Sequence, residues 1–194
     1  MFRYFSITVV FLTLLAQVAS AALYKVDPVH SQLLFTADHL MIFKVTGSFN
    51  DFNGEIEADA ATKSLSSASA TVEVKSIDTR EQMRDAHLLS ADFFDAANHP
   101  QMTFVSKRIE GKGDQITVYA DLTIRGTTRE VPFRGSFRGE QADPWGKVRA
   151  GFTASAVINR HDFGLKWNKA LETGGFVVGD LIAIDLEVQA IRAK

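Results

Sequence analysis

The chain has 194 residues, 21 basic and 23 acidic side chains with a formal net charge of −2, and no cysteine. The lack of thiols excludes disulfides, thiolate metal sites and cysteine nucleophiles. A nearly neutral charge without a basic stripe argues against a nucleic-acid-binding protein.

The first 21 residues have the pattern of a secretory signal peptide. Arg3 is their only charged side chain, an apolar stretch covers 7–15, and Ala19-Ser20-Ala21 places small residues where a signal peptidase cleaves. The apolar stretch is shorter than the roughly 20 residues that cross a bilayer as a helix. We therefore expect export to the periplasm, cleavage after Ala21, and a mature domain over 22–194 without stable membrane insertion.

Alternation of apolar and polar side chains predicts strands along the mature chain. Turn signals rich in glycine, or containing proline, lie at 110–114, 125–127 and 143–146. The expected strands are 24–27, 32–36, 41–49, 52–58, 68–75, 101–108, 116–124, 130–137, 151–158 and 182–190. They make one domain of mainly β structure.

One segment, near residues 79–97, breaks the alternation and predicts a short helical insertion. Asp78 followed three residues later by Glu81 resembles a capping box, which places a helix start at Asp78. Ser90 is expected to begin a second, shorter helix. Pro100 ends the insertion before the next strand.

Long amphipathic strands must close into a barrel or stack as two sheets. Their apolar face carries small residues, including Ala68, Ala120, Gly135 and Ala154, beside many of the 15 phenylalanines. A barrel of about eight strands with such a face is either filled by alternating small and large side chains or hollow, and composition leaves both open. The opposite face carries Glu, Lys, Asp and Thr, which disfavours a membrane barrel with an apolar exterior.

Several motifs recur in order along the mature chain. They include Tyr24-x-x-Asp27-x-x-His30-Ser31, Gly47-x-Phe49-x-x-Phe52-x-Gly54, Arg84-Asp85-x-His87-Leu88 and Arg160-x-Asp162-Phe163-Gly164-Leu165. Together they resemble the YceI-like family over essentially the whole mature chain. The resemblance implies a single closed, antiparallel, lipocalin-like barrel that is hollow and binds a polyisoprenoid or another long-chain lipid.

The resemblance and the apolar face together give a set of candidate lipid-contacting residues. They are Phe35, Phe43, Phe49, Phe52, Leu88, Phe93, Phe94, Phe104, Phe133, Phe152, Ala154 and Trp167. Arg84, His87 and Arg160 are candidates for binding a polar lipid head, since an arginine fork suits a phosphate or carboxylate. The alternative is that these polar residues form salt bridges that fix loops at the barrel rim.

Catalysis is not expected from this sequence. Asp162-Phe163-Gly164 matches a protein-kinase triplet, but the other kinase motifs are missing, and the five histidines do not have zinc-site spacing. We expect neither a metal nor a cofactor. Two functions stay open: a periplasmic carrier for an isoprenoid or similar lipid, and a ligand-free stress or adhesion module that acts through its surface. A homodimer is compatible with either.

Overall fold

Strands make up most of residues 21–193, the part of the chain that this computed structural model describes. The strands are β1 (Ala22–Val26), β2 (Gln32–His39), β3 (Phe43–Phe49), β4 (Phe52–Asp59), β5 (Ser64–Glu73), β6 (Ile77–Asp78), β7 (Gln101–Lys112), β8 (Gln115–Ile124), β9 (Thr127–Ala142), β10 (Val148–Asn159) and β11 (Val178–Arg192). The helices are α1 (Gln82–Leu89) and the short 3-10 turns η1 (Pro28–His30), η2 (Val74–Ser76) and η3 (Arg160–Phe163).

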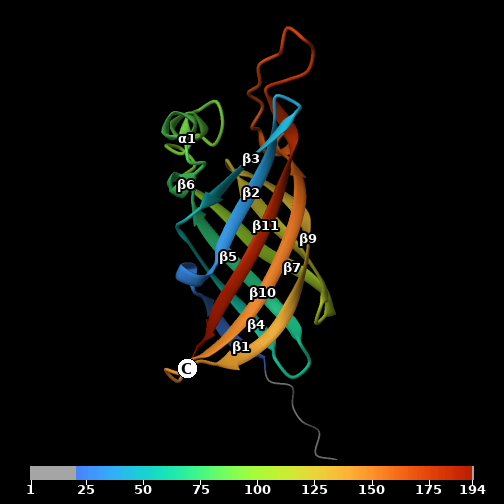
Figure 1. Cartoon of the computed structure of the whole chain (residues 1–194). Coiled ribbons are helices and arrows are strands. Elements are labelled where there is room, and N and C mark those ends of the chain that lie inside the picture. Colours follow the sequence, from blue (N-terminus) through green and yellow to red (C-terminus); the bar gives the residue numbers. More distant parts are fainter. Residues whose placement is uncertain (1–20, 194) are drawn as a thin grey trace, which may run out of the picture.

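The sheet closes on itself through β11, which is long enough to pair with two strands. Its last residues pair with β1, for example Ala190 with Val26, and its middle pairs with β2, for example Leu186 with Leu33. β1 and β2 therefore form one long strand broken by η1. In the same way, β3 and β4 together form the neighbouring long strand, and β5 and β6 together form the next one. With β7 to β11, the sheet has eight strand positions and is an up-and-down antiparallel barrel (Figure 1). The predicted mainly β, closed, antiparallel barrel is confirmed.

One end of the barrel, where β1 begins, is packed solid. Tyr24, Phe137 and Ala190 have no exposed surface there. The Phe152 ring stacks on Phe137 with 4.6 Å between centroids and meets the edge of Tyr24 at 6.1 Å. The close packing of these three buried aromatic rings makes this end a stable base that closes the barrel.

The predicted helical insertion between β6 and β7 is confirmed by α1, but the start of the helix and the rest of the insertion differ from the prediction. Glu81, not Asp78, caps α1, because its carboxylate accepts hydrogen bonds from the backbone N–H groups of Met83 and Arg84. Arg80 has a left-handed φ of 63°, so the chain turns before the helix starts. The second helix expected at Ser90 is also wrong. That segment forms successive turns, in which the Ser90 carbonyl accepts from two later N–H groups.

Among the described residues, no helix is both long and apolar enough to cross a bilayer. α1 has only 8 residues, and it lies at the end of the barrel opposite the packed base (Figure 1).

An ion-pair clamp ties the packed base together. The Arg149 guanidinium lies 2.7 Å from both Asp27, next to β1, and Asp143, in the turn before β10. Its hydrogen bond is the main reason that the pKa of Asp143 lies below its ordinary value. Burial by itself would raise the pKa of Asp27, but hydrogen bonds from Arg149 and His30 lower it overall.

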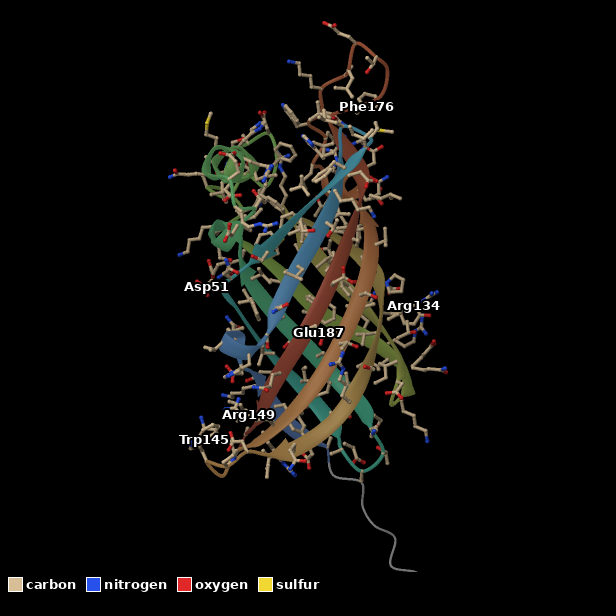
Figure 2. The ribbon with its side chains drawn as sticks, viewed as in Figure 1. Asp51, Arg134, Trp145, Arg149, Phe176 and Glu187 are labelled. Atoms are coloured by element: carbon tan, nitrogen blue, oxygen red, sulfur yellow. The ribbon has the colours of Figure 1, made fainter. Side chains whose placement is uncertain are left out.

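This clamp predicts acid sensitivity. A carboxylate with a lowered pKa stabilises the fold above its unfolded pKa, and the contribution is lost as pH falls through the folded pKa. We expect Asp143→Asn to flatten the loss of unfolding free energy between roughly pH 5 and pH 2, measured by urea unfolding. Asp51→Asn is the control, since Asp51 is exposed on the barrel exterior (Figure 2). Equal acid curves for wild type and Asp143→Asn would contradict the prediction.

Candidate functional site

Above the packed base the barrel encloses a cavity of about 270 Å³. Along β11 the inward side chains show where packing gives way to open space. Ala190 is fully buried at the base, whereas Ile182, Ile184 and Leu186 are only partly buried although they face inward. Side chains that point into a barrel yet stay accessible border a vacant lumen. The barrel is therefore hollow over most of its length.

The cavity is long rather than round. Its lining runs along β11 from Val178 to Val188, or about 33 Å at about 3.3 Å per residue. With strands tilted by about 40°, the depth along the barrel axis is roughly 25 Å. A cavity of this shape fits an extended chain better than a compact, rigid molecule.

Small residues on the strands make the open space. Ala68, Ala70 and Ala154 are part of the lining. Gly47 lies beneath the Phe35 ring, and a Cβ there would fall 2.4 Å from its Cζ atom. The lack of a side chain at Gly47 lets Phe35 lie flat along the wall instead of filling the centre.

The insertion covers the upper part of the lumen. Leu88, Phe93 and Phe94 belong to the lining. The Phe94 ring meets Phe49 of the barrel edge-on at 5.8 Å, and the Phe93 ring packs 5.2 Å from Trp167. These contacts hold the apolar side of the insertion against the open end of the barrel.

Nine of the twelve predicted apolar residues lie in the cavity wall. They are Phe35, Phe49, Leu88, Phe93, Phe94, Phe104, Phe133, Phe152 and Ala154. Ligand contact by these side chains stays a prediction.

The other three predicted residues lie outside the lining. Phe43 is 70% exposed. It lies at the start of β3, where only β2 pairs with the strand, because β6 pairs with Ser48 and Phe49 alone. Phe52 is buried within packed core instead of bordering the open space. Trp167 packs behind the cavity wall, on the rings of Phe93 and His87.

Sequence reasoning missed most of the aliphatic wall. Among the missed residues are Val26, Leu33, Ile56, Ile182, Ile184, Leu186 and Val188, which all lie on strands that the sequence analysis predicts. For the four residues of β11, the signal that could have found them was the alternation of that strand, which puts Ile182, Ile184, Leu186 and Val188 on one inward face.

Two of the three predicted head-group residues do not face the lumen. The Arg84 guanidinium donates to the hydroxyl and the carbonyl of Thr79, both at 2.8 Å. His87 lies 2.9 Å from Asp92 and packs on Trp167. Both side chains hold the insertion together, which agrees with the alternative that they fix loops at the rim.

Arg160 does border the cavity, but its donors are already occupied. It is 3% exposed, and its nitrogens donate to the carbonyls of Gly179, Leu165 and Trp167 at 2.6–2.9 Å. Longer contacts of 3.4 Å reach Val178 and Asp180. Burial lowers the pKa of Arg160 from its ordinary value, and Asp180 opposes this shift. The side chain remains a cation, and its donors bind the segment that follows η3 and the start of β11.

The described residues contain no group of three or more His, Asp or Glu side chains placed to hold a metal ion. The lining instead consists almost entirely of hydrocarbon, with Arg160 as its only charged member. Fold and site together define a hollow, lipocalin-like barrel whose interior suits apolar molecules.

Comparison with known proteins agrees with this class. Residues 24–190 match the YceI-like domain, so the chain belongs to the YceI-like family. A UPF0312 protein of Staphylococcus epidermidis is 37% identical over 167 residues, which cover 86% of this chain and 95% of that protein. A UPF0312 protein of Pseudomonas putida is 35% identical over 179 residues, which cover 91% and 90%.

Solved structures share the fold. BcnA of Burkholderia cenocepacia superposes with a TM-score of 0.73 at 26% identity, covering 85% of this chain and 99% of that one. The YCEI protein of Campylobacter jejuni gives 0.71 at 30% identity, covering 81% and 90%. A polyisoprenoid binding domain from Saccharophagus degradans gives 0.67 at 16% identity, covering 90% and 100%, which is a likeness of fold.

Proposed function

We propose that this protein is a periplasmic carrier that holds one polyisoprenoid, or a similar long-chain lipid, in the barrel lumen. The observation that carries the proposal is a long cavity with an apolar wall, in which the donors of the one charged residue, Arg160, are bound by backbone carbonyls. Such a wall favours a hydrocarbon chain, and no histidine, aspartate or glutamate lines it to activate its few hydroxyl groups. The role is therefore binding rather than catalysis.

The relatives support this proposal at the level of the fold. The barrel of Saccharophagus degradans is described as a polyisoprenoid binding domain, and it has the same architecture as this chain. The apolar wall supports the proposal independently of the relatives. Because it has few polar groups, the protein would select its lipid by the length and shape of the tail. An apolar tube rejects an unsuitable head group only weakly.

The expected affinity follows from buried area. A tail that buries roughly 500 Å² of apolar surface gains on the order of 12 kcal/mol at about 25 cal/mol per Å². If association and chain ordering cost about 4 kcal/mol, at the low end of the usual range, binding is micromolar. A rigid, preformed lumen keeps that cost low.

Native mass spectrometry of the protein purified from its own host tests the proposal. We expect a bound species in the mass range of a long-chain lipid, which solvent extraction removes. A protein mass free of lipid under all growth conditions would contradict the carrier function and favour the ligand-free stress or adhesion module.

Export is part of the proposal. The predicted signal peptide lies outside the described residues except for Ala21. Cleavage after Ala21 would leave β1 complete, since β1 begins at Ala22, which pairs with Ala58. N-terminal sequencing of protein from the host periplasm should therefore read Ala22 first. Recovery of the chain in the cytoplasm with Met1 intact would contradict both export and location.

A further inference from the structure

The turn between β2 and β3 and the first residue of β3 expose four apolar residues in a row. The exposed fractions are 38% for Leu40, 64% for Met41, 86% for Ile42 and 70% for Phe43. Isolated apolar side chains are common on protein surfaces, but a contiguous patch generally marks a place of contact. This turn therefore needs an explanation beyond the barrel fold.

The turn is held in a conformation that projects these side chains. Leu40 and Met41 have left-handed φ values of 52° and 63°, which non-glycine residues rarely adopt. The Leu40 N–H donates to the Val177 carbonyl at 2.9 Å, so the segment after η3 braces the turn. That segment adds Phe176, which is 53% exposed. We call Leu40, Met41, Ile42, Phe43 and Phe176 the apolar lip.

The lip lies at the end of the barrel opposite the packed base. Phe176 lies at the end that carries α1, whereas Trp145 and Arg149 lie at the other end (Figure 2). This is also the end where Leu88, Phe93 and Phe94 cover the lumen. The exposed apolar surface thus lies at the same end of the molecule as the covered opening of the lumen.

Exposed lysines lie close to the lip in the sequence. Within 38–44 and 164–177, the exposed charges that are not bound elsewhere are Lys44, Lys166 and Lys169 against Asp38 and Glu172. Apolar side chains flanked by lysines suit the surface of a bilayer that contains anionic lipids.

We propose that the apolar lip inserts into the surface of a lipid bilayer and docks the open end of the barrel there for lipid transfer. The inference rests on the proposed carrier function. A bilayer is favoured over a protein because a molecule that fits an almost entirely apolar lumen is nearly insoluble in water. The lipid then comes from a membrane and is delivered to a membrane. Docking spares the lipid from passing through water between the membrane and the lumen.

The test is binding to vesicles of phosphatidylcholine and phosphatidylglycerol, measured by co-sedimentation of protein purified from its host. We expect the double variant Ile42→Ser/Phe43→Ser to lower the partition coefficient at least about tenfold, because two exposed apolar side chains no longer insert. The matched control is Val29→Ser/Trp145→Ser, which removes residues that are 86% and 82% exposed but lie away from the lip. The control should bind vesicles like wild type.

Binding of farnesol from water separates this inference from the carrier function. Wild type and both double variants should bind farnesol equally, because the lumen is unchanged. Farnesol binding without vesicle binding by wild type would overturn the docking proposal alone. No farnesol binding by any of them would overturn the carrier function itself. A dimer that Ile42→Ser/Phe43→Ser converts to monomer would assign the lip to a second copy of the chain and overturn docking to a bilayer.

Discussion

Ala154→Trp should abolish lipid binding while leaving the apo barrel folded. Ala154 faces the lumen from β10 and belongs to the cavity wall. An indole at this position would occupy open space that the lipid tail needs. Affinity for a fluorescent long-chain isoprenoid should fall by at least about 100-fold, since roughly 2.7 kcal/mol or more of tail burial is lost. Fluorescence titration measures this loss directly.

The same substitution distinguishes a hollow barrel from a filled one. In a filled core the added volume would lower the free energy of unfolding by roughly 1–3 kcal/mol or more. In the open lumen we expect a change of less than about 1 kcal/mol, measured by urea unfolding without lipid. Ser155→Trp is the matched control, because Ser155 is the next residue on β10 and points outward into solvent. Unfolding by Ala154→Trp but not by Ser155→Trp would show a packed interior.

The strands could be predicted because their signal is local. In β8, the apolar residues from Ile116 to Ile124 alternate with polar ones, and the burial pattern of the strand follows that alternation. Closure of the barrel is not local. It depends on β11 pairing with both β1 and β2, whose partner residues lie 139 to 168 positions earlier in the chain. Alternation gives each strand an inner face but not its neighbours.

The cavity wall was predicted only in part, because the position of a side chain in the barrel also depends on how the strands pair. Phenylalanine stood out by number, and most of the predicted rings do border the lumen. Phe43 does not border the lumen, because strand pairing in the assembled sheet determines where the barrel wall ends. The aliphatic residues of β11 escaped notice because any buried strand carries similar ones. Only the cavity shows that Ile182 and Leu186 face open space instead of packed side chains.

Arg160 shows most clearly what the sequence could not reveal. An arginine in a lipid-binding protein suggests contact with a head group. Here its fork instead binds the carbonyls of Leu165, Trp167 and Gly179. Those partners come from the segment after η3 and the start of β11, and only the fold brings them together. Arg160 therefore positions the segment that braces the apolar lip.

Arg160→Met should be among the most destabilising single substitutions in the chain. The methionine keeps the apolar stem, but it leaves three buried or partly buried carbonyls without a donor. Each unsatisfied buried acceptor costs about 1–3 kcal/mol, so we expect a loss of about 3–5 kcal/mol in the free energy of unfolding. Arg160→Lys should recover little of it, since one ammonium group cannot reproduce the fork.

The control for charge removal is Arg138→Met. Arg138 pairs with Glu187 at 3.1 Å, but both side chains are well exposed, so its loss should cost less than about 1 kcal/mol. Urea unfolding without lipid measures all three variants. If Arg160→Met left the apo protein as stable as Arg138→Met but weakened lipid binding, Arg160 would bind a head group after all. A large loss of apo stability would instead show that the guanidinium group of Arg160 stabilises the open end of the barrel by binding backbone carbonyls.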